Sequence, residues 1–183
     1  VLRGDQRSKP IGQLVAEARA LAATGVKEVN LIGQDTTGWG ADLPGGLELA
    51  DLLAALDQVE GLTWIRVQYT YPRLWSDRLI ETWARAKRIV PYVDMPLQHA
   101  DAGVLGRMGR GGSDEKLARL LETVRATVPG VAVRTTFIVG FPGEGETEFR
   151  ALEDFVRAMR FDAVGVHLYS PEEGTRAERL GDP

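Results

Sequence analysis

Residues 134–144, Arg-Thr-Thr-Phe-Ile-Val-Gly-Phe-Pro-Gly-Glu, carry the strongest chemical signal in the chain. An apolar run breaks at Gly140 into a glycine and proline turn, and an acidic amphipathic stretch follows from Glu146. This pattern predicts a buried strand with a sharp turn at its carboxyl end. Because ligands of parallel α/β proteins bind at the carboxyl ends of strands, we expect chemistry at this turn.

Polar residues follow each of the five predicted strands. In chain order these ends are Gln34-Asp35-Thr36-Thr37, Tyr69-Thr70-Tyr71-Pro72, Gln98-His99, Gly140 to Glu144, and Tyr169-Ser170-Pro171-Glu172-Glu173. The opposite rim offers ordinary helix-to-strand turns such as Thr24-Gly25 and Pro129-Gly130. Since the carboxyl ends of parallel strands share one rim, these amides, hydroxyls, carboxylates and one imidazole should converge on a single mouth.

Each of these polar residues also has an ordinary structural explanation. Asp35 could form an Asx-turn with the loop that follows it, and His99 could be a satisfied structural histidine. Arg134, at the start of an apolar strand, could pair with a helix carboxylate. Gly109-Arg110-Gly111-Gly112 lacks the lysine of a P-loop and the spacing of a dinucleotide-binding fingerprint, so we interpret it as a flexible loop that carries an arginine.

The sequence shows no nucleophile or metal site. It has two histidines, His99 and His167, and no Gly-x-Ser-x-Gly elbow, which argues against a serine triad and against a histidine metal site. Its four lysines fall in predicted loops or helices, which argues against a Schiff-base aldolase. With no cysteine, these residues alone can hold neither a thiolate zinc site nor an iron–sulfur cluster. The mouth should therefore bind a ligand whose reactive centre comes from elsewhere.

Alternating strand-like and helix-period segments position these strand ends. Apolar strands are predicted at 26–33, 63–69, 89–97, 131–139 and 163–169, with amphipathic helices between them and with Ser76 and Ser113 as candidate N-caps. The strands are nearly continuously apolar, as a parallel sheet covered on both faces requires. Right-handed crossovers curl such a sheet in one direction. We predict an α/β fold, a partial (β/α) TIM-like barrel of about five parallel strands with outer helices, whose first strand is missing.

The composition is typical of one soluble domain. The 183 residues are 44% hydrophobic, which is enough for a sizeable core. No apolar run approaches the roughly 20 residues of a membrane span, and no signal-peptide pattern opens the chain, so we expect a cytoplasmic protein without membrane contact. A net charge of −4 argues against direct nucleic-acid binding by this core.

Several motifs, in the correct order and across essentially the whole chain, resemble the methylthiotransferases among the radical S-adenosylmethionine (SAM) enzymes. Arg7-Ser8-Lys9-Pro10 resembles the segment after the cluster loop of that family, and residues 29–37 resemble its second-strand motif. Residues 96–100 and Met108-Gly109-Arg110 resemble its fourth strand and the loop after it, and residues 134–144 resemble its fifth strand. The resemblance implies a barrel of the radical SAM type.

Two branches of that family differ at positions that this chain allows us to compare. The tRNA-modifying (MiaB-type) branch usually has Gln-Asn-Val-Asn at residues 34–37 and Ser-His-Pro near residues 69–72. Here both segments, and residues 169–175, resemble the RimO-type branch, which modifies the β-carbon of an aspartate on a small-subunit ribosomal protein. The tRNA branch and a non-catalytic partial-barrel module that docks a protein loop remain the alternatives.

The resemblance implies a transferase with SAM and two [4Fe-4S] clusters. In the family, a Cys-x3-Cys-x2-Cys loop after the first strand holds the cluster that reduces SAM to a 5′-deoxyadenosyl radical. A second cluster in a preceding domain carries the sulfur, a TRAM domain helps to hold the substrate, and flavodoxin or ferredoxin supplies electrons. This chain starts just after the position of that loop, so we expect the cluster cysteines upstream of Val1. We predict that residues 1–183 are an incomplete radical SAM core, without the preceding and TRAM domains, and are inactive alone.

The resemblance also implies where the cofactor binds. The methionine end of SAM should lie near Gln34 and Asp35, with Arg134 facing its carboxylate as a paired charge. Gln98 should contact the ribose or the methionyl part. The residues expected beside the adenine are Val139, Gly140 and the backbone of Tyr169.

On the substrate side of the mouth, the candidates are Tyr71, His99 and Glu172. The resemblance places the radical chemistry at the upstream cluster, so no catalytic residue and no metal ligand are expected within this chain.

Overall fold

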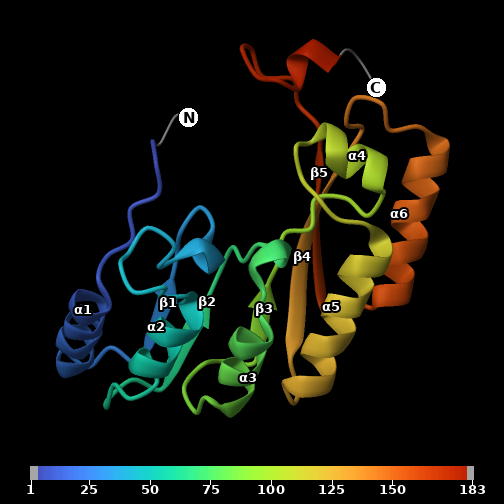
Figure 1. The fold of residues 1–183 in the computed structure, drawn as a ribbon. Helices are drawn as coiled ribbons and strands as arrows, with labels where there is room; N and C mark the ends of the chain where they lie inside the picture. The colour runs from blue at the N-terminus through green and yellow to red at the C-terminus, as the bar shows by residue number, and fades with distance from the viewer. Residues whose placement is uncertain (1–3, 181–183) are drawn as a thin grey trace.

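The computed structural model describes residues 4–180, which fold as helices and strands in alternation (Figure 1). The strands are β1 (Glu28–Leu31), β2 (Trp64–Val67), β3 (Tyr92–Asp94), β4 (Ala132–Val139) and β5 (Ala163–Leu168). The helices are α1 (Ile11–Ala23), α2 (Leu49–Leu56), α3 (Asp77–Arg85), α4 (Ala102–Arg107), α5 (Asp114–Thr127) and α6 (Glu146–Met159). Short 3-10 turns lie at Thr36–Gly38, Pro72–Leu74 and Glu178–Leu180.

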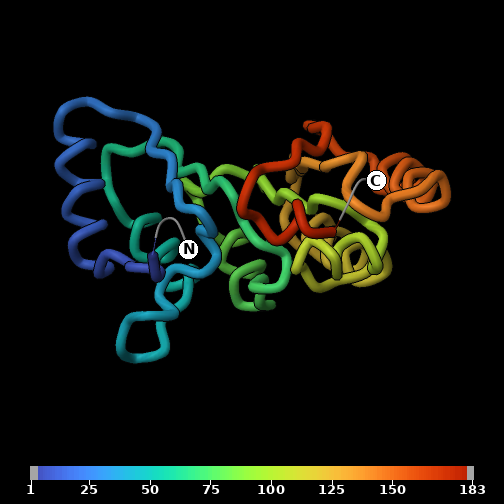
Figure 2. Tube along the Cα trace, turned by 90° about the horizontal axis from the view of Figure 1, so that it is seen from above, coloured from blue at the N-terminus to red at the C-terminus, as the bar shows by residue number. Residues whose placement is uncertain are grey.

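All strand pairs are parallel, and neighbours in sequence are neighbours in space. β1 pairs with β2, and β3, β4 and β5 form a second ladder. A parallel bridge between Ile65 and Ile89 joins the two ladders, with a Val90 N–H donating to the Ile65 carbonyl at 3.0 Å. The predicted α/β architecture with five parallel strands is thus confirmed. Figure 2 shows the N-terminal and C-terminal parts at opposite ends of the molecule, so the described strands form no closed barrel.

The helices cover one face of the sheet. Alternate residues of β2 and β4 are buried, among them Ile65, Val67, Val133 and Phe137, and they share one core cluster with apolar residues of α2, α3, α5 and α6. The expected coverage of both faces does not occur within residues 4–180. The reason is that Arg66, Arg134 and Thr136 stand between the buried residues of β2 and β4, which gives these strands the period-2 pattern of a half-buried strand.

The two outer strands have one neighbour each in the described part of the chain. Beside β1, Ile32 is 69% exposed. On β5, Val166 and Leu168 are 58% and 82% exposed. Each edge therefore combines free backbone groups with uncovered apolar side chains.

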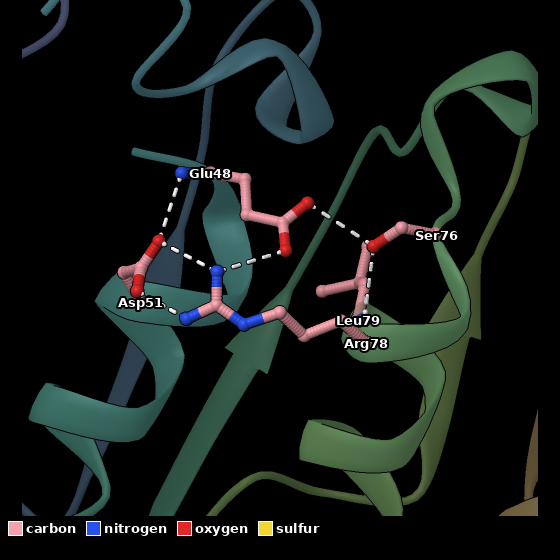
Figure 3. A network of polar contacts seen from close by, with 5 residues as sticks. All are labelled: Glu48, Asp51, Ser76, Arg78 and Leu79. Atoms are coloured by element: carbon pink, nitrogen blue, oxygen red, sulfur yellow. Dashed lines mark hydrogen bonds and ion pairs between the residues drawn. The ribbon is translucent and has the colours of Figure 1, made fainter. Parts of the chain in front are cut away.

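Helices α2 and α3 are joined at their amino ends by a polar network (Figure 3). The Ser76 hydroxyl accepts from the Leu79 N–H at 3.1 Å, which confirms the predicted cap, and it also donates to Glu48. The Arg78 guanidinium contacts the carboxylates of both Glu48 and Asp51, and this pairing lowers the pKa of Asp51. The loops that follow β1 and β2 lead into the amino ends of α2 and α3. The network therefore fixes these two loops on the side of the predicted mouth.

Two local features differ from the sequence prediction. Ser113 stands at the amino end of α5 but makes no capping hydrogen bond through its side chain. The short helix α4 was not predicted, because its six residues contain two glycines and are too few for a clear helical period. Its start is defined by Asp101, whose carboxylate accepts from the Val104 N–H at 2.8 Å.

Candidate functional site

The carboxyl ends of the five strands meet at one rim, as predicted. Backbone hydrogen bonds link each end to the next: Thr36 N–H to Tyr69 O (3.0 Å), Thr70 N–H to Asp94 O (2.9 Å), Gln98 N–H to Thr136 O (2.8 Å) and Tyr169 N–H to Val139 O (2.8 Å). Two non-glycine residues of this rim, Tyr69 and Gln98, have left-handed backbones with φ of 58° and 72°. Such conformations cost about 1–3 kcal/mol and cluster at functional sites.

At the first strand end, Asp35 is held by its own loop. The Thr37 hydroxyl donates to the Asp35 carboxylate and accepts from the Tyr71 N–H at 2.8 Å. This contact joins two side chains, whereas an Asx-turn bonds the carboxylate to the backbone two residues on, so it is not the Asx-turn of the structural alternative. Thr36 and Thr37 are buried, whereas Gln34 is exposed. Asp35 thus shapes the link between the first two strand ends.

Arg110 extends into the same part of the rim. Its guanidinium carbon lies 5.4 Å from the centroid of the Tyr71 ring. Burial lowers the pKa of Arg110, an effect that nearby Tyr71 and Asp35 partly oppose. The guanidinium forms no ion pair and no hydrogen bond with residues 4–180. A partly buried cation of this kind is suited to bind a ligand anion.

The sequence motif Met108-Gly109-Arg110 contained this residue, but the glycine-rich context led us to interpret it as a flexible loop. In the structure Gly109 has a φ of 72°. The chain turns there directly after α4, and this turn brings the Arg110 side chain back over Tyr71. The position of Arg110 could not be predicted without the short helix α4, because the end of this helix fixes where the loop begins.

Arg134 is paired within the sheet. Its Nη1 lies 2.7 Å from Oδ1 of Asp94, and the second carboxylate oxygen of Asp94 accepts from the Tyr69 N–H at 3.2 Å. The hydrogen bond to Asp94 raises the pKa of Arg134. The structural alternative for Arg134 foresaw a carboxylate partner, but the partner comes from neighbouring strand β3 instead of a helix. Asp94, which is 1% exposed, was not among the predicted site residues.

Below the rim, the open face of the sheet carries cross-strand polar pairs. Arg66 binds Glu28 at 2.8 Å and lies over the Tyr92 ring, 4.9 Å from its centroid. Gln68 donates to Asn30 at 3.3 Å, and the Arg134–Asp94 pair continues the series on β3 and β4. The surface beneath the mouth is therefore polar and hydrogen-bonded, whereas the helix-covered face is apolar.

His99 lies beneath the rim with no exposed surface. Its Nδ1 accepts from the Asp101 N–H at 3.0 Å, and its Nε2 lies 3.6 Å from Oε1 of Glu144. Burial leaves His99 no surface for substrate contact, but its Nε2 has no hydrogen-bond partner among the described residues, so it is not the fully satisfied histidine of the structural alternative. Burial lowers the pKa of His99, while Glu144 acts in the opposite direction.

The turn at residues 140–143, named the Gly140 turn below, lies beside the end of β5. Gly140 is exposed with a φ of 71°. The Tyr169 ring packs edge-on against Phe141 at 5.1 Å between centroids, and its buried hydroxyl has no partner among the described residues. The structure thus brings Val139, Gly140 and the Tyr169 backbone together, as predicted, whereas Glu172 is exposed on the segment beyond β5.

Two hollows adjoin the rim. The larger, of about 740 Å³, lies between α1, the segment 4–9 and β1, and it reaches the rim only at Gln34, Asp35 and Thr36. The smaller, of about 310 Å³, lies beside Val139 and Gly140. No group of three or more potential metal-ligating side chains occurs in residues 4–180. None of the described helices is long and apolar enough to cross a membrane.

Comparisons with known proteins agree with this geometry. The model of the radical SAM superfamily matches residues 1–156. Proteins named "Ribosomal protein uS12 methylthiotransferase RimO" are similar: that of Myxococcus xanthus is 51% identical over 181 residues, or 99% of this chain and 38% of the relative. That of Moorella thermoacetica is 48% identical over 179 residues, or 98% of this chain and 41% of the relative. The chain thus spans about two fifths of the length of these relatives.

Solved structures show the same fold at low sequence identity. The radical SAM methyltransferase TsrM from Kitasatospora setae, with cobalamin and a [4Fe-4S] cluster bound, has a TM-score of 0.70 at 19% identity, covering 87% of this chain and 31% of that one. Coproporphyrinogen III oxidase (HemN) from Escherichia coli has a TM-score of 0.68 at 14% identity, covering 93% and 40%.

Proposed function

Because the chain belongs to the radical SAM superfamily, we propose that it is the core of a methylthiotransferase that acts on ribosomal protein uS12. One observation carries this proposal: over 98% or more of this chain, proteins named uS12 methylthiotransferase are 44–51% identical to it. Within that activity, the proposed acceptor is the β-carbon of an aspartate. The whole enzyme would include segments beyond these 183 residues, because the relatives are more than twice as long.

The rim fits SAM as a ligand. It offers a cation at Arg110 that has no ion-pair partner within residues 4–180, an amide at Gln98, and a glycine turn with an apolar neighbour at Val139 and Gly140. When bound at a reduced [4Fe-4S] cluster, SAM supplies radical chemistry. The chain does not fit the cluster itself, because it contains no cysteine. Cluster ligands, the sulfur source and the electron donor therefore belong to other parts of the enzyme or to partners, and these 183 residues would not turn over alone.

Within this site, we assign the carboxylate of SAM to Arg110 rather than to Arg134. Among the residues that the structure describes, Arg110 has no carboxylate partner, whereas Arg134 already neutralises the buried Asp94. Binding an anion would offset the desolvation that burial imposes on the Arg110 guanidinium. Arg134 would then support the site indirectly. It would hold Asp94, whose carboxylate in turn binds the N–H of the left-handed Tyr69.

The other positions divide between the two ends of the cofactor and the substrate. Gln34 and Asp35 would lie near the methionyl group, Gln98 near the ribose, and Val139, Gly140 and the Tyr169 backbone beside the adenine. Tyr71 and Glu172 remain the proposed substrate-side residues. Tyr71 stacks on Arg110, so it would stand where the cofactor and the substrate meet.

The test is an assay of the full-length protein that carries this chain, with clusters reconstituted and a chemical reductant present. Purified uS12 and tRNA are offered separately, and the products are examined by mass spectrometry. A methylthio group on an aspartate of uS12 is the expected result. If tRNA is modified instead, the chain belongs to the tRNA-modifying branch of the family. SAM left intact, by a protein shown to hold its clusters, would contradict the radical chemistry.

A further inference from the structure

Two buried polar atoms that have no hydrogen-bond partner within residues 4–180 face each other behind the rim. They are Nε2 of His99 and Oε1 of Glu144, and they lie 3.6 Å apart. The His99 side chain has no exposed surface and the Glu144 side chain only 3%. Buried polar atoms are nearly always satisfied in folded proteins. An orphaned pair that differs from a hydrogen bond by only a few tenths of an ångström therefore calls for an explanation.

The remaining atoms of both side chains fix their chemical state. Nδ1 of His99 accepts from the backbone N–H of Asp101, so it carries no proton, and the proton of neutral imidazole must be on Nε2. Oε2 of Glu144 accepts from the Phe141 N–H at 3.1 Å, which leaves Oε1 free to accept. The donor of His99 thus points at the free acceptor of Glu144.

The pair connects two segments that line the mouth. His99 follows Gln98, whose backbone is left-handed and exchanges hydrogen bonds with Thr136 and Ile138 on β4. Glu144 closes the Gly140 turn through its contact with Phe141. A shift of either partner would therefore change the distance between Gln98 and Gly140.

The other charged groups near His99 support the turn or belong to the same loop. Arg107 on α4 donates to the carbonyls of Pro142 and Gly143 at 3.0 and 2.6 Å. Asp101 caps α4 through its carboxylate. Among the charges around the imidazole, Glu144 and Asp101 favour its protonation and Arg107 disfavours it. The Gly140 turn is thus held by α4 on one side and by His99 on the other.

We propose that His99 and Glu144 are a positioning pair that holds the Gly140 turn against the segment that follows β3 and so sets the width of the cofactor site between Gln98 and Gly140. This inference rests on the proposed function, because it assigns these two residues to SAM binding. Neither residue touches the cofactor. Both act through the segments to which they belong.

The decisive variant is Glu144→Gln in the full-length protein with its cluster reconstituted. A glutamine amide has one acceptor, but the site presents two donors, Nε2–H of His99 and N–H of Phe141. One donor contact must be lost whichever way the amide turns. We expect the KM for SAM to rise about tenfold, equivalent to about 1.4 kcal/mol, with a smaller change in kcat. Amide hydrogen exchange in residues 138–146 should become faster.

Two further variants separate positioning from general stability. His99→Gln retains a neutral N–H donor near the place of Nε2, so its KM should stay close to that of the unaltered protein. His99→Leu removes the donor, and its KM should rise as in Glu144→Gln. Glu81→Gln is the matched control, because Glu81 is exposed on α3, lies outside both hollows and forms an exposed ion pair with Arg85. It should leave both KM and hydrogen exchange unchanged.

The outcomes distinguish this inference from the function on which it rests. Faster exchange with an unchanged KM in Glu144→Gln would refute the positioning role while the unaltered enzyme still cleaves SAM. The same raised KM in His99→Gln and His99→Leu would also refute it, because the donor would then be irrelevant. If the unaltered, cluster-loaded protein does not cleave SAM, the proposed function fails, and the inference fails with it.

Discussion

Replacing Arg110 by glutamine should separate ligand binding from folding more cleanly than any other change at the rim. The guanidinium stacks on Tyr71 and pairs with no carboxylate in the described part of the chain. Its loss removes a cation–π contact of about 0.5–1 kcal/mol, which the relief of desolvation partly offsets. We therefore expect the free energy of unfolding to fall by less than about 1 kcal/mol.

The effect of Arg110→Gln on the cofactor should be larger. A hydrogen bond between charged groups contributes about 1.5–3 kcal/mol, so SAM affinity should fall roughly 10- to 100-fold. Arg134→Gln is the matched comparison. It leaves the carboxylate of Asp94 buried without its cation. Breaking a fully buried pair costs about 3–5 kcal/mol, and the 38% exposure of the Arg134 side chain reduces our expectation to about 2 kcal/mol of lost stability.

The assay combines equilibrium dialysis with labelled SAM on the reconstituted full-length protein and urea unfolding of the same preparations. The expected pattern is weak binding with normal stability for Arg110→Gln, and low stability for Arg134→Gln with binding close to normal under folded conditions. The reverse pattern would show that the carboxylate of SAM binds Arg134 and not Arg110. Normal SAM affinity in Arg110→Gln would refute the reasoning from its unpaired charge.

Three further changes have defined outcomes. Ser76→Ala removes the hydroxyl that caps α3 and should lower the free energy of unfolding by about 1 kcal/mol, measured in urea with the exposed Ser170→Ala as control. In Gly140→Ala the new Cβ meets no atom within 4 Å, but the backbone keeps a φ of 71°. Because alanine disfavours this left-handed conformation, the free energy of unfolding should fall by about 1–2 kcal/mol. An unchanged melting temperature would contradict this. The folded-state pKa of His99 is lowered by burial, so its neutral form contributes stability that is present above the unfolded pKa of about 6.5 and is lost as pH falls below it. The melting temperature should therefore fall between pH 7 and 5, and His99→Gln should reduce that dependence; an identical pH profile in both proteins would show that His99 is not responsible.

The strands were predictable because their apolar residues are local signals. Each of the five predicted ranges contains an observed strand, and the cap at Ser76 followed from a serine before an amphipathic stretch. The coverage of the sheet was harder to predict. Arg66 and Arg134 interrupt apolar runs only at single positions, and those positions become significant when register places them on one face.

The polar contacts of the site could not be predicted from sequence patterns. Asp94 belongs to a strand of three residues, and its pairing with Arg134 joins positions 40 residues apart. The proximity of His99 to Glu144 and of Arg110 to Tyr71 likewise depends on where α4 packs beside the strand ends. Side chains can be assigned to a strand end from sequence, but their partners depend on tertiary packing.

The two free edges of the sheet affect how the chain must be handled in solution. An uncovered parallel strand is a template on which another extended segment can pair. The apolar residues beside these edges, Ile32, Val166 and Leu168, increase the gain from such pairing. The 183-residue chain should therefore associate through its edges as its concentration rises, and sedimentation would detect this as a concentration-dependent mass. Charged substitutions at Ile32 and Leu168 should improve solubility without disturbing the core, because both side chains already face water.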